Sequence, residues 1–201
     1  MPNNEKRLEV VEEIPLYRGF FNLSRIRLRH TLYGGGWSPL LERELFHRGR
    51  AAAVIPYDPE TDRVVLIEQF RIGALGHAPS PWLIEIVAGA VEEGETPEQV
   101  ACREAREEAG CEIRALIPIA EFFATPGACS EKITLFCGLV DSRGVGGVHG
   151  LPEEQEDILA RVLSFADAWA CMEQGRIDSA IPIIALQWLA LHRARLRPGP
   201  A

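Results

Sequence analysis

The sequence predicts an α/β fold in which a mixed sheet lies between helical layers, preceded by a small N-terminal antiparallel β unit. Short, partly alternating segments fill the first 48 residues, apolar strand-like runs follow from Ala51 onward, and helical patterns are interspersed among those runs. We therefore divide the chain into residues 1–48, an N-terminal β unit expected to mediate dimerisation, and residues 49–201, the main domain.

Three segments predict the strands of the N-terminal unit, namely "RLEVVEEI", "FFNLSRIRLRHTLY" and "WSPLLERELFHR". Within the second, "RIRLRH" alternates strictly between charged and apolar residues, which is typical of a strand with one solvated face. The glycine-rich "YGGGW" predicts a turn. Because a few short strands rarely bury enough surface to fold alone, we expect this unit to pack on the main domain or on a second subunit.

The main domain begins with "AAAVIPY" and "RVVLIEQFR", two strands joined across the turn-forming "DPETD". We expect "WLIEIVAGAV" to form one further apolar strand, and "EIRALIPIAEFFAT", "KITLFCGLVD" and "ILARVLSF" to form others. The segment "RGVGGVHGLPEEQED" predicts a glycine-rich loop that becomes acidic, and we interpret His149 as a loop residue rather than a metal ligand. Two later helices are predicted, one capped by Ser164 and the other within "SAIPIIALQWLALHRARL".

Composition limits the classes of function. The chain has 201 residues, 47% of them hydrophobic, which is enough for one full core and a small additional unit. The formal net charge of -8 argues against nucleic acid as the main partner. No apolar run approaches the ~18 to 20 residues of a membrane span, and the polar start lacks the apolar core of a signal peptide. We expect a cytoplasmic protein, bound to no membrane, whose five cysteines are reduced thiols.

A glutamate-rich helix between Thr96 and Gly110 carries the main functional signal. Thr96, Pro97 and Gln99 form a helix-start pattern, and Gly110 predicts the helix end. At about 100° per residue, three glutamates fall on one arc that borders the apolar face, while the two arginines of the helix are expected to point away. The three glutamates are Glu104, Glu107 and Glu108.

A solvated charged helix is the commoner meaning of such a sequence, but its carboxylates would lie opposite the apolar face. Like charges one turn apart repel each other, and the cost rises near a packed surface. A hard divalent cation removes this conflict, because Mg²⁺ prefers oxygen ligands from carboxylates and substrate phosphates. Gly89, between a strand and the loop before the helix, permits a close approach of the backbone.

From Gly89 to Gly110 the spacing is Gly, five residues, Glu, seven residues, Arg-Glu, two residues, Glu-Glu, one residue and Gly. This string resembles the Nudix box of the Nudix hydrolases, with Ala105 and Cys111 smaller than usual at its two apolar positions. From about Leu16 to His192 the chain looks like the ADP-ribose pyrophosphatase branch, through segments such as "LYRGFF", "RGRAA" and "HGLPEEQEDI".

The resemblance implies a Nudix α/β/α sandwich and a small nucleoside diphosphate as substrate. It implies hydrolysis of the pyrophosphate bond of ADP-ribose to AMP and ribose 5-phosphate, with Mg²⁺ as the cofactor and Mn²⁺ or Zn²⁺ as alternatives. It also implies a homodimer formed through the N-terminal region. Chemically, divalent ions suit such a reaction because they neutralise the pyrophosphate and activate water.

The resemblance also assigns roles to residues of the box and of the later acidic loop. Glu154 would be the general base, with Glu153 and Glu131 as competing candidates, and Arg103 would orient the glutamates by ion pairing. Glu95 would brace the turn before the helix. The implied metal ligands are the backbone carbonyl of Ala88 and the side chains of Glu104, Glu107, Glu108 and, once the loop closes, Glu156.

Substrate-binding positions follow from the same resemblance. Arginines pair well with phosphates, although a lone arginine is more often a surface ion-pair residue. Phe20 and Phe21 fit strand packing as well as stacking on adenine from the partner subunit. Ala90 and the turn Thr125–Gly127 correspond to the positions where the family holds the terminal ribose. These positions are Phe20, Phe21, Arg43, Glu44, Arg48, Arg71, Ala90, Thr125, Pro126, Gly127 and Glu131.

Two other functions remain open from the sequence. One is a Nudix enzyme for another nucleoside diphosphate derivative, either a nucleotide sugar or a dinucleotide. The other is a non-catalytic domain that senses ADP-ribose; such relatives usually lose box glutamates and carry a DNA-binding segment, whereas this chain keeps every box glutamate.

Overall fold

The computed structural model describes residues 5–77 and 79–197, so the ends of both predicted regions, 1–4 and 198–201, lie outside the described chain, as does residue 78. The described chain divides into two compact units. The first runs up to Gly49 and also includes Phe123–Lys132; the second consists of Arg50–Phe122 and the chain from Ile133 onward.

The first unit is built on an antiparallel sheet of β1 (Leu8–Arg18), β2 (Asn22–His30) and β3 (Leu41–His47), in that order. The alternating arginines of β2 form ion pairs with glutamates of the two neighbouring strands, as expected for cross-strand partners on a solvated face. The segment Phe123–Lys132 joins this unit through backbone hydrogen bonds, because the N–H of Phe46 donates to the carbonyl of Ala128.

The second unit holds a larger sheet and the helices. The order of the sheet in the described chain is β10-β11-β5-β4-β9-β8, with β6 beside β5 and β7 beside β4. Its strands are β4 (Arg50–Asp58), β5 (Arg63–Phe70), β6 (Trp82–Glu85), β7 (Val87–Ala90), β8 (Ala115–Phe123), β9 (Lys132–Leu139), β10 (Gly147–His149) and β11 (Ile158–Ser164). The helices are α1 (Pro97–Ala109), α2 (Phe165–Glu173) and α3 (Ala180–Leu196), with short 3₁₀ turns η1 (Ile72–Ala74) and η2 (Pro152–Glu154).

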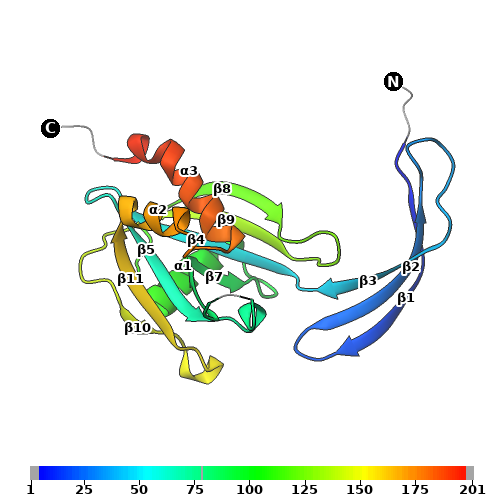
Figure 1. Ribbon diagram of the computed structural model, residues 1–201, viewed down its shortest axis with the longest axis horizontal. Helices are drawn as coiled ribbons and strands as arrows, with labels where there is room; N and C mark the ends of the chain where they lie inside the picture. Colours follow the sequence, from blue (N-terminus) through cyan, green and yellow to red (C-terminus); the bar gives the residue numbers. More distant parts are fainter. Residues whose placement is uncertain (1–4, 78, 198–201) are drawn as a thin grey trace. The chain divides into compact units, whose positions relative to one another are not determined.

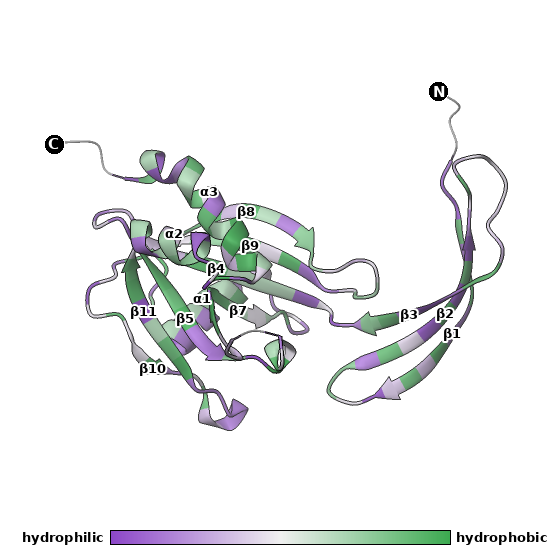
Figure 2. Cartoon of the chain, in the orientation of Figure 1, coloured by the Kyte–Doolittle hydropathy of each residue, from purple (hydrophilic) through white to green (hydrophobic). Residues whose placement is uncertain are grey.

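Helices cover both faces of the larger sheet (Figure 1). Ile55 and Leu66 point to one face and pack in a cluster with residues of α2 and α3. Their neighbours Val54 and Val65 point to the other face and pack with α1. Because both faces of the sheet are covered, successive residues of β4 and β5 are all apolar, which gives these strands nearly continuous apolar sequences. Figure 2 shows their hydrophobic colouring between the helices. The predicted α/β/α sandwich with a mixed α/β composition is confirmed.

Two local expectations were wrong. The segment "WLIEIVAGAV" forms two strands instead of one, because β6 pairs with β5 whereas β7 pairs with β4. The chain changes partner at Ile86, which is buried. The glycine-rich loop also contains a short strand, β10, paired with β11. In the part of the chain that the structure describes, the helices are all too short or too polar to cross a membrane.

Candidate metal and catalytic site

Helix α1 begins and ends as its sequence predicts. Oγ1 of Thr96 accepts a hydrogen bond from the backbone N–H of Gln99, and the Gln99 side chain accepts one from the N–H of Thr96. Gly110 ends the helix in the left-handed conformation, with φ of 62°. Because both ends are fixed by local hydrogen bonds, the helix presents its glutamates to β7 in a defined rotation.

Glu108 is the most buried acid of the box. Glu108 is only 2% exposed, and its carboxylate accepts a hydrogen bond from the backbone N–H of Ala88 at 3.0 Å. Burial raises the pKa of Glu108 to about 8, the charges of Glu104 and Glu156 act in the same direction, and the Ala88 N–H opposes the shift. Burial also raises the pKa of Glu104. A positive charge near Glu104 and Glu108 would therefore stabilise the ionised form of both carboxylates.

Because Gly89 has no side chain, the carboxylate of Glu104 can lie directly against its backbone. A Cβ added at Gly89 would lie 1.8 Å from Oε1 of Glu104 and 2.2 Å from its Cδ, so no other residue fits there without moving the carboxylate. Gly89 lies on β7 opposite Ala52 of β4, which fixes its backbone in the sheet. The carboxylate of Glu104 is therefore held against the strand backbone, next to the residue whose N–H contacts Glu108.

Arg103 joins the acids of the box. Its Nη1 donates to Glu104 at 2.9 Å and to Glu107 at 2.8 Å, and its Nε donates to Glu95 at 3.2 Å. Our expectation that Arg103 points away from the glutamates was wrong, because its long side chain folds back along the helix surface. Burial alone would lower the pKa of Arg103, but the hydrogen bonds and charges of the three glutamates raise it overall. Glu95 also accepts the N–H of Glu92, so it ties the preceding loop to the helix.

A further ion pair lies close to Glu108. Nε of Arg71 donates to Glu85 at 2.7 Å, and the positive charge of Arg71 acts to lower the pKa of Glu108. Arg71 directly follows β5 and Glu85 ends β6. We did not single out Glu85 from the sequence, although its position as the one acid within the apolar "WLIEIV" was a usable signal.

Glu154 and Glu156 of the later acidic loop differ in their surroundings. The charge of Glu156 raises the pKa of both Glu104 and Glu108, so Glu156 lies near the box, and its carboxylate accepts the N–H of Leu151 at 3.3 Å. Glu154 lies on η2 and is exposed. Its exposed side chain is therefore in contact with solvent.

The donor chemistry of this site fits a hard divalent cation. All candidate side-chain ligands are carboxylates, and the Gly89 backbone leaves room for one of them. Among the residues that the structure describes, Glu108 is a buried acid without a cationic hydrogen-bond partner. Among the described residues, no three His, Cys, Asp or Glu side chains are already gathered as a metal-holding group. In this structure the carboxylates of Glu104 and Glu107 instead form ion pairs with the guanidinium of Arg103, which lies between them.

The remaining predicted residues divide between the two units. Ala90 ends β7 in the second unit, whereas the others, Phe20, Phe21, Arg43, Glu44, Arg48, Thr125, Pro126, Gly127 and Glu131, belong to the first. The structure brings together three of these. Arg48 lies over the ring of Phe21 at 4.3 Å and forms an ion pair with Glu131 at 2.9 Å. Arg43 is exposed and donates to the neighbouring carbonyl of Glu42.

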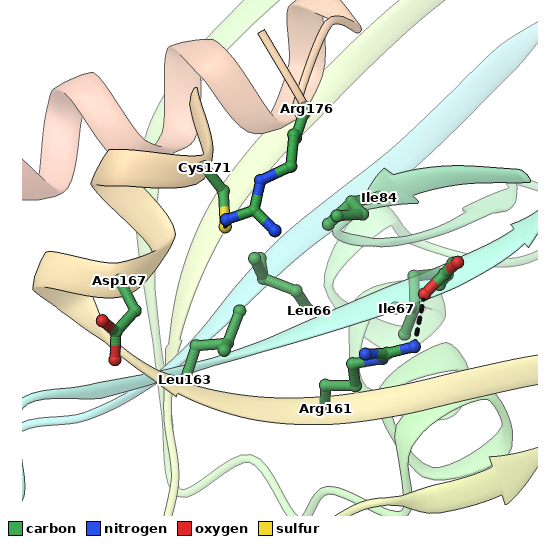
Figure 3. Close-up of a pocket in the computed structure, with 9 residues that line it drawn as sticks. Leu66, Ile67, Ile84, Arg161, Leu163, Asp167, Cys171 and Arg176 are labelled. Atoms are coloured by element: carbon green, nitrogen blue, oxygen red, sulfur yellow. Dashed lines mark hydrogen bonds and ion pairs between the residues drawn. The ribbon is translucent and has the colours of Figure 1, made fainter. Parts of the chain in front are cut away.

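A cavity of about 260 Å³ lies beside α2 (Figure 3). Apolar side chains such as Leu66 and Leu163 line it, together with an ion pair between Arg161 and Glu68. The guanidinium of Arg176 points to the thiol of Cys171. None of the predicted site residues lines this cavity, and Leu66 belongs to the core cluster shared with α2 and α3, so the cavity is separate from the acids of α1.

Residues 47–196 match the NUDIX domain family. The chain belongs to this family. The ADP-ribose pyrophosphatase of Escherichia coli is 47% identical to it over 190 residues, which cover 94% of this chain and 91% of that protein. The protein of the same name from Haemophilus influenzae is 47% identical over 197 residues, covering 96% and 91%. The predicted placement in the ADP-ribose pyrophosphatase branch of the Nudix hydrolases is confirmed.

Two further comparisons extend this picture. The GDP-mannose pyrophosphatase of Cronobacter sakazakii is 35% identical over 151 residues, covering 75% of this chain and 78% of that protein. A solved structure described as an ADP compounds hydrolase matches with a TM-score of 0.71 at 18% identity, over 96% of this chain and 97% of that one. This structural match supports the fold. The protein is thus a Nudix pyrophosphohydrolase, and dependence on a divalent metal is general among such enzymes.

Proposed function

We propose that this Nudix enzyme hydrolyses the pyrophosphate bond of ADP-ribose to AMP and ribose 5-phosphate, with Mg²⁺ as its metal ion. The observation that carries the proposal is 47% identity, across 94% of the chain, to a protein named for this reaction. The acid cluster of α1 supports it, because the buried Glu108 has no cationic hydrogen-bond partner among the described residues and a pyrophosphate needs its charge neutralised.

The cation would be held by carboxylates on two elements. Glu104 and Glu108 of α1 are the main ligands in this proposal, with Glu107, Glu156 and the carbonyl of Ala88 completing the set. When bound, the ion neutralises the pyrophosphate and activates the attacking water. Mn²⁺ and Zn²⁺ are alternatives in this role.

The residues of the chain then have separate tasks. The oxygen of water attacks a phosphorus, the bridging P–O bond breaks, and the carboxylate of Glu154 takes the proton of the water. Arg103 holds Glu104 and Glu107 through its two Nη1 hydrogen bonds, which supports its assigned role. Arg71 contributes positive charge beside Glu108 and is suited to a phosphate oxygen.

Recognition of the nucleoside is assigned to the first unit. We propose that Phe20 and Phe21 stack on adenine from the partner subunit and that Arg43, Glu44, Arg48 and Glu131 contact the substrate. In this proposal Thr125–Gly127 of the first unit and Ala90 of the second are further substrate-binding positions. The contact of Arg48 with Phe21 and Glu131 supports a common site for these three residues, because it holds an aromatic face, a cation and an anion together.

We further propose that residues 1–48 mediate a homodimer and that residues 49–201 form the hydrolase domain. The N-terminal unit supports this, since the connections between its strands expose large apolar side chains such as Phe20 at 94% and Tyr33 at 92%. A mass of two chains in sedimentation equilibrium is the expected result, and a single-chain mass at micromolar concentration would refute it. The five free thiols support a reducing, cytoplasmic location.

A substrate panel tests the proposed reaction. With Mg²⁺ present, we expect ADP-ribose to be cleaved with the highest kcat/KM and to yield AMP and ribose 5-phosphate on anion-exchange chromatography. The identity to a GDP-mannose pyrophosphatase makes GDP-mannose the specific rival substrate. A higher kcat/KM for GDP-mannose would replace the proposal, and tight binding of ADP-ribose without any product would instead support a sensing domain.

A further inference from the structure

The acidic loop of the proposed site closes a β-hairpin. Residues 150–157, which contain Glu154 and Glu156, connect β10 to β11, and the last strand pair before the loop is His149 with Ile158. Ile158 is fully buried, so the β11 side of the hairpin is anchored in the core. The position of the two acids therefore depends on how the β10 side of the hairpin is held.

The β10 side is fixed to the last turn of α1. The N–H of Gly150 donates to the carbonyl of Glu107 at 3.1 Å. The last four carbonyls of a helix have no partner within the helix, so this hydrogen bond satisfies a group that would otherwise need water. The same residue, Glu107, belongs to the acid cluster through its side chain.

The imidazole of His149 makes a second contact with this helix end. A Cβ placed at Gly110 would lie 2.8 Å from Cε1 of His149, so the ring rests directly against the backbone of the helix-ending glycine. Nε2 of His149 lies 3.2 Å from the carbonyl of Gly146, which orients the ring. Gly110 thus has two reasons to lack a side chain: its left-handed φ and the ring that covers it.

The loop itself is tightly folded where it leaves these contacts. Gly150 has φ of 103°, and a Cβ there would lie 2.7 Å from the Cβ of Glu156. The Glu156 carboxylate accepts the N–H of Leu151. A chain of contacts therefore runs from Gly110 through His149 and Gly150 to Glu156, which acts electrostatically on Glu104 and Glu108.

We infer that His149 is a positioning residue, whose ring seats the acidic loop 150–157 on the last turn of α1 and so fixes the loop acids relative to the box acids. The inference rests on the proposed function, because it assumes that the loop acids take part in hydrolysis. The flat shape of the ring against Gly110 is the essential property. A misplacement of about 1 Å by such a support can cost on the order of 100-fold in rate.

Three variants test this role. His149→Ala removes the ring, and His149→Phe keeps a flat ring without the nitrogen atoms. His192→Ala is the matched control, because His192 is also half-buried and its ring donates one hydrogen bond to a backbone carbonyl, that of Trp188, but it lies on α3. For each, kcat and KM for ADP-ribose, the melting temperature, and hydrogen exchange of peptides covering residues 150–157 are measured with Mg²⁺ present.

We expect His149→Ala to lower kcat by about 10- to 100-fold, with KM within about twofold of wild type. We also expect faster exchange in loop 150–157, while His149→Phe restores most of kcat and His192→Ala leaves it unchanged. A kcat of His149→Ala within twofold of wild type would overturn the inference. So would a loss in His149→Phe as large as in His149→Ala, or unchanged exchange in the loop. If wild type fails to cleave ADP-ribose, the proposed function fails, and the exchange measurement alone decides whether His149 seats the loop.

Discussion

A methyl group at Gly89 tests whether the position of the Glu104 carboxylate matters. Gly89→Ala keeps the strand, because Gly89 lies in the regular pairing of β7 with β4 and its φ lies outside the positive range that disfavours side chains. The new Cβ, however, would lie 1.8 Å from Oε1 of Glu104. The substitution therefore acts on one carboxylate of the box while leaving its charge and number intact.

The size of the effect follows from this geometry. A real Cβ stays at least 3.0 Å from such an atom, so the Glu104 carboxylate must retreat from 1.8 Å by more than an ångström. A displacement of about 1 Å in a reacting site costs on the order of 100-fold in rate, or about 2.7 kcal/mol of activation free energy. The strained rotamer costs about 0.5–1.5 kcal/mol of stability, which lowers the melting temperature by a few degrees.

The assay is steady-state hydrolysis of ADP-ribose at increasing Mg²⁺ concentration. We expect kcat/KM of Gly89→Ala to fall about 100-fold and the Mg²⁺ concentration for half-maximal rate to rise. Gly73→Ala is the matched control, because a Cβ at Gly73 meets nothing within 4 Å in the described chain and its φ is ordinary. A kcat/KM for Gly89→Ala within threefold of wild type, with unchanged Mg²⁺ dependence, would refute the reasoning.

Three further predictions concern single side chains. Arg103→Lys should lower kcat about tenfold with little loss of stability, because one ammonium group does not bridge Glu95, Glu104 and Glu107 together. The control Arg106→Lys, at the exposed ion pair with Glu112, should leave kcat unchanged. Equal losses of kcat in both variants would contradict this prediction. Glu154→Gln should lower kcat at least 100-fold without changing the Mg²⁺ dependence, whereas Glu153→Gln should not; the opposite pattern would move the general base to Glu153. Asp58 accepts hydrogen bonds from Ser142 and Thr61; burial alone would raise its pKa, but these bonds lower it. Because the pKa of Asp58 is lower in the folded than in the unfolded state, its contribution to stability is present above about pH 4 and is lost as the pH falls further. Asp58→Asn should therefore reduce the free energy of unfolding by about 1.5–3 kcal/mol at pH 7, measured by urea titration. A difference in unfolding free energy between wild type and variant that stays constant down to pH 2 would contradict the assignment.

The features that the sequence predicted well are set by local chemistry. The start of α1 depends on Thr96, Pro97 and Gln99, which lie within four residues of each other, and its end depends on Gly110. The Ser164 cap of α2 is local in the same sense, since it accepts the N–H of Asp167. The spacing of the box likewise brings Glu104 and Glu108 to one side of a single helix, so their closeness required no knowledge of tertiary structure.

The features that were missed depend on contacts distant in sequence. Phe123–Lys132 joins the N-terminal strands through hydrogen bonds to Phe46, and no local pattern marks that choice. The division of "WLIEIVAGAV" at Ile86 depends on which strand each half pairs with. The contact of His149 with Gly110 brings together residues 39 positions apart, and a histidine in a glycine-rich loop gives no sign of it.

The central claim is that the crowded carboxylates of α1 work by holding a divalent cation. The most direct measurement is ADP-ribose hydrolysis by protein stripped of metal with a chelator and then titrated with Mg²⁺, for wild type and Glu108→Gln. We predict no turnover in the stripped protein, full recovery in wild type, and a loss of several orders of magnitude in Glu108→Gln at every Mg²⁺ concentration. Turnover of the stripped wild type at its original rate, or full recovery of Glu108→Gln, would contradict the account.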